Sequence, residues 1–205
     1  DFLWAAGELA AMGYREMNLN LGCPSGTVTA KGKGSGMLRD LDFLDRFLEE
    51  IFADAPLPIS VKTRLGFESA EEFPRLMEIF NRYPIRELTV HPRIRDQFYK
   101  GSVDMDSFRY AQDHCKIPLC YNGDLISLKK VREFEAAFPQ VDAVMIGRGL
   151  IGDPGMLLPG GTDAKTLEAF FDVLLETYTV EFSGPRNAMF RLKENWGFLI
   201  HKFEG

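Results

Sequence analysis

The chain contains few cysteines and no long hydrophobic run. Its 205 residues include three cysteines, Cys23, Cys115 and Cys120, which form neither a CxxC pair nor an even set. This argues against a secreted disulfide framework and against structural zinc, and leaves a thiol free for chemistry. No apolar stretch reaches the roughly 18 residues of a membrane-spanning helix, and no basic segment precedes an apolar one at the start. We therefore expect a cytoplasmic protein with no signal peptide, no membrane contact and no metal.

The chain also lacks an excess of positive charge. It has 24 Lys and Arg against 30 Asp and Glu, a formal net charge of −6. This balance argues against indiscriminate binding to nucleic acid, so any contact with RNA must come from a local basic patch. Hydrophobic residues (45%) and charged residues (26%) are present in the proportions of one globular core.

Short apolar runs alternate with amphipathic runs along most of the chain. Strands are predicted at Glu16–Leu21, Ile59–Thr63, Glu87–His91, Ile117–Asn122 and Asp142–Ile146. Helices are predicted at Leu41–Phe52, Ala70–Asn81, Met105–Asp113 and Ser127–Phe138, with helical structure beginning as early as Met37, after the glycine-rich stretch 32–36. Short apolar strands joined by helices predict a parallel sheet with helices outside it.

The fold class is therefore α/β. A spacing of about 30 to 40 residues between strands, with no GxGxxG motif after the first one, favours a βα barrel over a Rossmann sheet. We predict a TIM (βα)8-type barrel of which about five βα units are present in this chain, followed by a small helical C-terminal region.

A polar cluster lies at or just after the end of each predicted strand. In order, the clusters are Cys23; Lys62 and Arg64; His91 and Arg93; Asn122, Gly123 and Asp124; and Gly147, Arg148 and Gly149. The carboxyl ends of the strands in a βα barrel meet at one mouth, where barrel enzymes have their active sites. The five clusters therefore predict one site around that mouth.

Five runs of the sequence carry a family resemblance. In chain order they are NLNLGCPSGTVTAKGKGSGML, SVKTRLG, TVHPR, YNGD and DAVMIGRG, and they resemble the tRNA-dihydrouridine synthases over about residues 1–155. The resemblance implies an FMN-dependent barrel that reduces specific uridines in tRNA to 5,6-dihydrouridine, with NADPH as the reductant. Old yellow enzymes and dihydroorotate dehydrogenases share the barrel and the flavin, but the Asn-x-Gly-Cys-Pro start favours the synthases.

The resemblance implies that Cys23 is the catalytic acid. Flavin N5 and the C5=C6 bond of uracil exchange a hydride, and C5 needs a proton from the opposite face. A thiol with an unperturbed pKa near 8.5 is mostly protonated at neutral pH and can supply that proton. The alternative is a buried cysteine that packs as a small hydrophobe.

The resemblance also implies a set of flavin ligands. Lys62 would contact the flavin ring, where its charge favours the anionic reduced form, and His91 would be a ligand of flavin or substrate. The phosphate cup would comprise Asn122, Gly123, Asp124, Gly147 and Arg148, because glycine backbone N–H groups approach phosphate closely and arginine pairs with it bidentately. The alternatives are a salt-bridged rim lysine, a satisfied rim histidine and ordinary tight turns.

Substrate contacts are implied for four residues. Asn20 would hydrogen-bond the uracil edge or the flavin, or alternatively cap the turn at the strand end. Arg64, Arg93 and Arg95 would form a positive lip for tRNA phosphates, together with Lys31, Lys33 and Lys100. The alternative for each of these cations is a solvated loop side chain.

Two domains are predicted, with Pro159-Gly160-Gly161 as the linker. Residues 1–158 would form the partial barrel that carries FMN and the catalytic residues. Residues 162–205 would form a helical domain of the tRNA-binding type, with helices near Leu167–Val180 and Phe190–Phe203, the latter containing Trp196 and His201. Packing between these helices is the alternative explanation for their aromatic residues.

The resemblance also makes the chain look like a fragment. Residue 1 corresponds to the helix before the fourth strand of the family's barrel, and five strands cannot close an eight-stranded barrel. One alternative function is therefore an inactive remnant that binds tRNA or oligomerises. Another is a small-molecule FMN ene-reductase or a barrel like dihydroorotate dehydrogenase, which would need neither a basic lip nor a helical tail.

Overall fold

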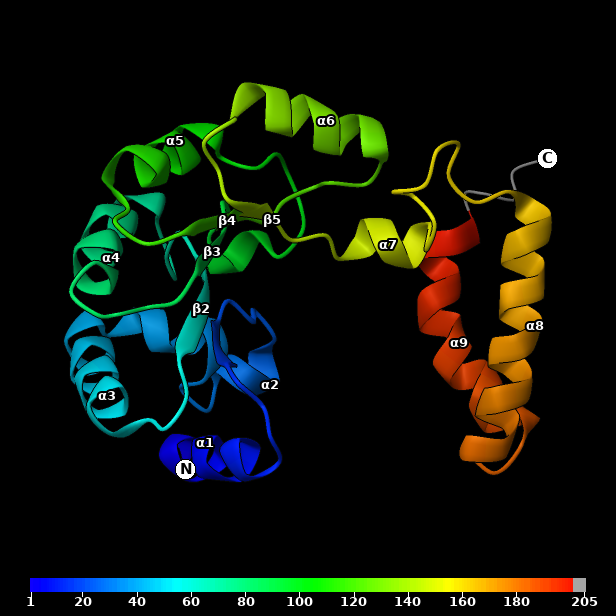
Figure 1. Cartoon of the computed structure of the whole chain (residues 1–205), viewed down its shortest axis with the longest axis horizontal. Helices are drawn as coiled ribbons and strands as arrows, with labels where there is room; N and C mark the ends of the chain where they lie inside the picture. Colours follow the sequence, from blue (N-terminus) through cyan, green and yellow to red (C-terminus); the bar gives the residue numbers. More distant parts are fainter. Residues whose placement is uncertain (201–205) are drawn as a thin grey trace. The chain divides into compact units, whose positions relative to one another are not determined.

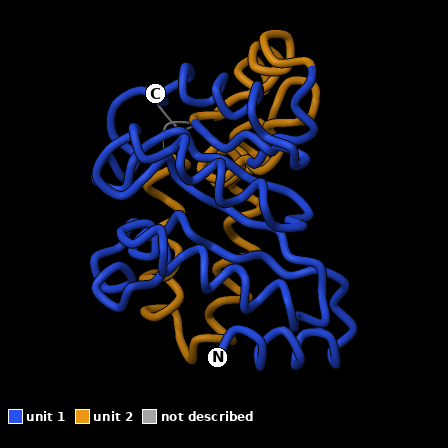
Figure 2. The backbone as a smooth tube through the Cα atoms, turned by 90° about the vertical axis from the view of Figure 1, so that its left-hand side faces the viewer, with its two compact units in different colours: residues 1–123, 140–145 blue, residues 124–139, 146–205 orange. Residues whose placement is uncertain are grey.

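The computed structural model describes residues 1–200, which divide into two compact units (Figure 2). The first unit comprises residues 1–123 and 140–145, and the second comprises residues 124–139 and the chain from residue 146. The predicted functional domains, 1–158 and 162–205, follow the order of the chain and stay a prediction.

The first unit contains one parallel sheet. Its strands are β1 (Met17–Leu21), β2 (Ile59–Arg64), β3 (Leu88–His91), β4 (Leu119–Tyr121) and β5 (Ala143–Val144), in the spatial order β1-β2-β3-β4-β5. Every neighbouring pair is parallel. The α/β class and the five barrel-type βα units predicted from the sequence are therefore confirmed.

Among the described residues the helices of the first unit are α1 (Phe2–Ala11), α2 (Gly26–Thr29), α3 (Leu41–Asp54), α4 (Phe73–Phe80) and α5 (Met105–His114). In β1 the buried and exposed residues alternate, with Leu19 and Leu21 buried and Asn18 and Asn20 exposed. Figure 1 shows α3, α4 and α5 together on one side of the strands. The other face of the sheet is therefore left for polar side chains.

The first long helix begins later than predicted. Residues 34–39 form a 3₁₀ turn, and α3 begins at Leu41 rather than near Met37. Asp40 sets this boundary, because its carboxylate accepts a hydrogen bond from Phe43 N at 2.9 Å and so caps the helix. The glycine-rich stretch is thus a packed turn and not the start of the helix.

The second unit is helical. It contains α6 (Leu128–Ala137), α7 (Arg148–Gly152), α8 (Ala164–Glu181) and α9 (Pro185–Leu199). The predicted C-terminal helical region is confirmed, although α9 begins five residues before the predicted Phe190, with Pro185 in its first turn. His201 and Phe203, placed in this helix by the sequence, lie outside the described residues. Within residues 1–200, no helix combines the length and the apolar character needed to cross a membrane.

Candidate active site

One row of side chains crosses the polar face of the sheet. Asn20 of β1 pairs in register with Lys62 of β2, Lys62 with Thr89 of β3, and Thr89 with Cys120 of β4. Residues directly paired across neighbouring strands point to the same face, so these four side chains share one surface. Thr89 and Cys120 were not predicted as site residues, although the alternation of side chains along each strand could have indicated them.

Hydrogen bonds fix the backbone of the turn that carries Cys23, both before and after the cysteine side chain. Gly22 N donates to Asn20 Oδ1 at 2.9 Å, and Arg64 Nε donates to Gly22 O at 2.8 Å. The Cys23 carbonyl accepts from the backbone N–H of Ser35 at 3.0 Å and from its hydroxyl at 2.8 Å. The backbone is therefore fixed while the Cys23 side chain remains partly exposed. Asn20 makes the predicted capping contact, which leaves its amide N–H₂ group for another partner.

The glycine-rich stretch packs directly against this turn. Gly34 has a φ of +56°, and a Cβ added to it would lie 2.9 Å from both the Cβ and the carbonyl oxygen of Cys23. A Cβ added to Gly36 would lie 2.7 Å from Thr29 O. Only glycine fits at these two positions, so the stretch after Cys23 is a close-packed support for the thiol.

Lys62 is a partly buried cation for which residues 1–200 provide no ion-pair partner. A Cβ added to Gly22 would lie 3.6 Å from Lys62 Nζ, which places the ammonium beside the cysteine turn. Burial, followed by the charge of Arg64, lowers the pKa of Lys62 to about 8, and the two nearby thiols, Cys120 and Cys23, oppose that shift. Among residues 1–200 no hydrogen bond or ion pair of Lys62 is found. A partly buried ammonium of this kind is suited to an anionic ligand.

Stability should rise with pH in a way that depends on Lys62. Between about pH 8 and 10.5 the native lysine loses its proton while the unfolded lysine keeps it, so the unfolded state binds more protons and unfolding becomes less favourable. The penalty, at most about 3.4 kcal/mol, is fully present below about pH 8, decreases between pH 8 and 10.5, and is gone above about pH 10.5. We expect this increase in the free energy of unfolding of the native chain and not in Lys62→Met, measured by urea titration at both ends of the range.

The exposed Lys116 offers a matched control for this titration. Lys116→Met should keep the pH dependence of the unmodified chain, because its ammonium lies in water in both states. Equal curves for the unmodified chain and Lys62→Met would show that Lys62 is not desolvated.

Arg64 and Arg93 are buried and bind backbone carbonyl groups. Arg64 donates to Ile94 O at 3.0 Å and to Phe98 O at 2.8 Å, in addition to Gly22 O. Arg93 donates to the carbonyls of residues 100 and 101. Each side chain is 1% exposed. Both arginines therefore fasten the loop 94–101 to the strand ends, and their predicted place in an exposed lip for tRNA gains no support from the structure.

His91 lies against one of these arginines. It is buried at the end of β3, and Arg93 Nη1 lies 3.0 Å from its Nε2. Guanidinium has no acceptor, so Nε2 must accept, and the proton of a neutral ring is assigned to Nδ1. The His91 ring also stacks with Tyr99 at 6.1 Å. This corresponds to the alternative of a satisfied rim histidine, while a flavin contact stays a prediction.

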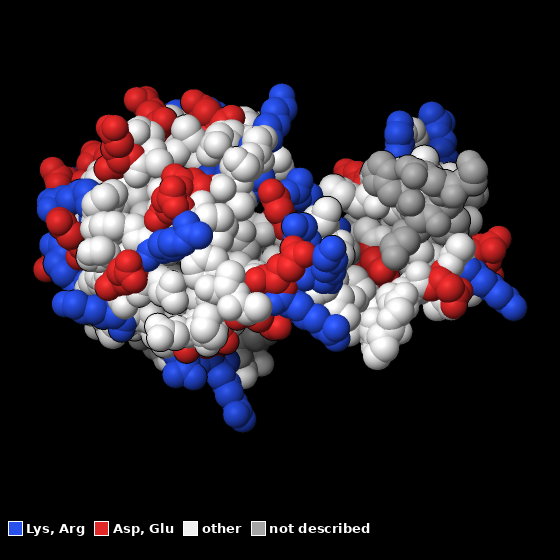
Figure 3. Space-filling view, turned by 90° about the horizontal axis from the view of Figure 1, so that it is seen from above, with Lys and Arg blue, Asp and Glu red and all other residues white. Residues whose placement is uncertain are grey.

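The remaining predicted cations are more accessible. Arg95 is partly exposed, lies over the rings of Phe67 and Phe98 and pairs with Asp96. The three lysines of the predicted lip are exposed: Lys31, Lys33 and Lys100. Figure 3 shows Lys and Arg interspersed with Asp and Glu over the face in view. A basic patch for RNA therefore stays a prediction that concerns Arg95 and these lysines.

The predicted phosphate loops are divided between the two units. In the first unit, Asn122 Nδ2 donates to Met145 O at 2.8 Å and ties the end of β4 to the end of β5, and Gly123 follows it. In the second unit, Arg148 Nη2 pairs with Asp124 Oδ1 at 2.7 Å, and Gly147 precedes α7. Each half of the predicted cup is therefore held by its own contacts, and phosphate binding stays a prediction. Among residues 1–200, no three His, Cys, Asp or Glu side chains are grouped as a metal site.

Comparison with known proteins places this site in a family. Residues 1–178 match the sequence profile described as Dihydrouridine synthase (Dus). A probable tRNA-dihydrouridine synthase of Rickettsia bellii is 32% identical over 82% of this chain and 54% of its own length. One of Rhizobium leguminosarum bv. phaseoli is 30% identical over 97% of this chain and 64% of its own length. tRNA-dihydrouridine synthase B of Pasteurella multocida is 29% identical over 69% of this chain and 43% of its own length.

The matches differ in how much of each protein they cover. The chain spans about half the length of the first of these relatives. Among solved structures, N-acetylneuraminate lyase of Proteus mirabilis matches 69% of this chain and 47% of its own, with 16% identity and a TM-score of 0.48, a likeness too slight to support an argument. The family profile, by contrast, covers the whole sheet with its Cys23 turn and Lys62. The chain belongs to the dihydrouridine synthase family.

Proposed function

We propose that the protein to which this chain belongs reduces uridines in tRNA to 5,6-dihydrouridine, with FMN as cofactor and NADPH as reductant. The observation that carries the proposal is the rigid turn that presents the partly exposed Cys23 beside the unpaired ammonium of Lys62. Membership of the family favours tRNA over the small-molecule substrates of other flavin barrels. A cytoplasmic location is part of the same proposal.

The chemistry requires a hydride and a proton on neighbouring carbons of uracil. FMN, when bound and reduced, would supply the hydride to C6 of the C5=C6 bond. The Cys23 thiol gives its proton to C5, and the fixed carbonyls on both sides of the cysteine keep Sγ in place for that transfer. The N–H₂ group of Asn20, whose oxygen already accepts from Gly22 N, is left to donate to a carbonyl of the uracil or the flavin.

The residues present fit a flavin. The Lys62 ammonium lacks an anionic partner among residues 1–200, and a pKa of about 8 leaves it mostly charged at neutral pH, as an anionic ring requires. His91 is the last residue of β3, which lies two strands away from β1 in the sheet. For the phosphate group we propose Asn122, Gly123, Asp124, Gly147 and Arg148. The helices from residue 162 would contribute to tRNA binding.

Flavin binding is the first test of this proposal. The purified chain with added FMN should show a protein-bound absorption band at about 450 nm. Its intensity should correspond to about one FMN per chain. Lys62→Ala should weaken binding at least about tenfold, because it removes a desolvated charge from the ring site. Retained flavin after gel filtration, read by absorbance, gives the result.

A lysine outside the site provides the comparison. Lys116→Ala removes the same charge from an exposed loop and should bind FMN as the unmodified chain does. If no chain retains FMN, the catalytic proposal is wrong for this polypeptide, and the remnant that only binds tRNA becomes the better hypothesis.

A further inference from the structure

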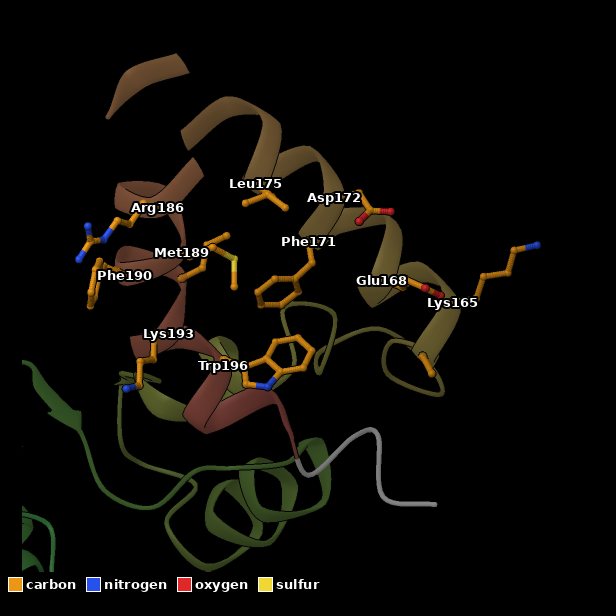
Figure 4. A pocket seen from close by; sticks show the side chains of 12 residues that line it. Lys165, Glu168, Phe171, Asp172, Leu175, Arg186, Met189, Phe190, Lys193 and Trp196 are labelled. Atoms are coloured by element: carbon orange, nitrogen blue, oxygen red, sulfur yellow. The ribbon is translucent and has the colours of Figure 1, made fainter. Parts of the chain in front are cut away.

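The second unit contains contacts of two kinds. Between α8 and α9 the contact is aromatic, and the rings of Phe171 and Trp196 pack edge to face at 5.1 Å (Figure 4). At the start of α7 the contact is ionic, because Arg148 Nη2 donates to Asp124 Oδ1 at 2.7 Å. The two side chains are 35% and 39% exposed, and an ion pair at that exposure contributes little to folding. The ionic contact therefore calls for a role other than stability.

The backbone brings these two charged side chains within reach of each other. A Cβ added to Gly149, the residue after Arg148, would overlap Leu125 O, so only glycine fits where α7 packs on the residues after Asp124. Asp124 itself has a φ of +47°, in the left-handed region where Asp, Asn and Gly are the common residues. The turn alone would accept any of these three residue types, but only Asp and Asn offer an oxygen to Arg148.

A carboxylate is a poor ligand for a phosphate group, because both are anions. Arg148 is the cation of the proposed phosphate cup, and its guanidinium has five N–H donors in a planar fork, enough to bind a carboxylate and a phosphate at different edges. We propose that Asp124 is a positioning residue, which holds the guanidinium of Arg148 for the flavin phosphate and does not bind the phosphate itself. This inference rests on the proposed function and assigns separate roles to two residues of its cup.

The affinities for FMN and riboflavin test the inference, since the two flavins differ only in the phosphate. Asp124→Gly fits the left-handed backbone and should weaken FMN binding about tenfold, with riboflavin binding unchanged, as titration of flavin fluorescence measures. Asp124→Asn should bind FMN within about threefold of the unmodified chain, because its amide oxygen still accepts from Arg148. Tighter FMN binding by either variant would show that Asp124 only repels the phosphate, and would overturn the inference.

A double-mutant cycle shows whether Asp124 acts through Arg148. Arg148→Met should weaken FMN binding at least about tenfold, and adding Asp124→Gly to it should change the affinity by less than about twofold. An equal effect of Asp124→Gly with and without Arg148 would overturn the inference. The exposed pair of Arg109 with Asp106, at 2.6 Å, is the matched control, and Asp106→Ala should leave both flavin affinities unchanged.

Inorganic phosphate provides a readout that needs no flavin. Phenylglyoxal modifies guanidinium groups, and mass spectrometry of digested peptides gives the rate at Arg148. Phosphate should slow this reaction in the unmodified chain and in Asp124→Asn, but not in Asp124→Gly. If this pattern appears while no chain binds FMN or riboflavin, the proposed function fails for this polypeptide and the positioning role stands. An effect of phosphate that is the same in all three chains would overturn the inference.

Discussion

Replacing Cys23 by Ala is expected to lower uridine reduction on tRNA by about 10²- to 10⁴-fold while FMN binding is retained. The thiol is the proton donor in the proposed reaction, and removing it leaves the hydride step without a partner at C5. The turn itself should survive, because its hydrogen bonds are made by the backbone of residues 22 and 23 and not by Sγ. Dihydrouridine formed per enzyme, counted by mass spectrometry of digested tRNA, is the measurement.

Cys115 provides the matched control for this substitution. It is also partly buried, its Sγ contacts Ile117 O at 3.4 Å, and burial raises its pKa. Cys115→Ala should keep full turnover, since the site does not use this thiol. Normal turnover by Cys23→Ala would show that another group protonates C5. Loss of both flavin and turnover would instead point to a collapsed turn.

The order and type of the elements in the first unit follow from local patterns. The strands predicted at Ile59–Thr63 and Glu87–His91 lie within one residue of β2 and β3, because their apolar residues recur at every second position, the period of a strand. The boundaries of the fourth and fifth strands were predicted less accurately. The strands predicted at Ile117–Asn122 and Asp142–Ile146 are only three and two residues long in the structure.

Contacts between residues far apart in the chain could not be predicted from the sequence. The resemblance implied that Arg64 and Arg93 belong to a positive lip for tRNA phosphates, with a solvated loop side chain as the alternative, whereas both are buried. Their partners are carbonyl groups, which every residue possesses and no side-chain pattern reveals. Ser35 was likewise missed, although its two hydrogen bonds hold the Cys23 carbonyl. Position along the strands located the site, but the way its turn is held depends on the tertiary fold.

Arg64→Met is expected to destabilise the first unit by about 3 kcal/mol. Three carbonyl groups, of Gly22, Ile94 and Phe98, would lose charged donors, each worth about 1.5 to 3 kcal/mol. The sum is offset in part because burial lowers the pKa of Arg64, which means that the folded state bears a cost for its charge. Urea unfolding followed by circular dichroism measures the difference.

The exposed Arg75 is the control, because its pair with Glu78 lies in water and Arg75→Met should change stability by less than about 0.5 kcal/mol. Arg64→Lys should fall between the two variants, since an ammonium cannot reach all three carbonyls as a planar guanidinium does. The same ordering should appear in the alkylation rate of Cys23, which rises as Gly22 O loses its donor and the turn loosens. A stability loss below about 1 kcal/mol for Arg64→Met would mean that water replaces the guanidinium, and that Arg64 does not hold the catalytic turn.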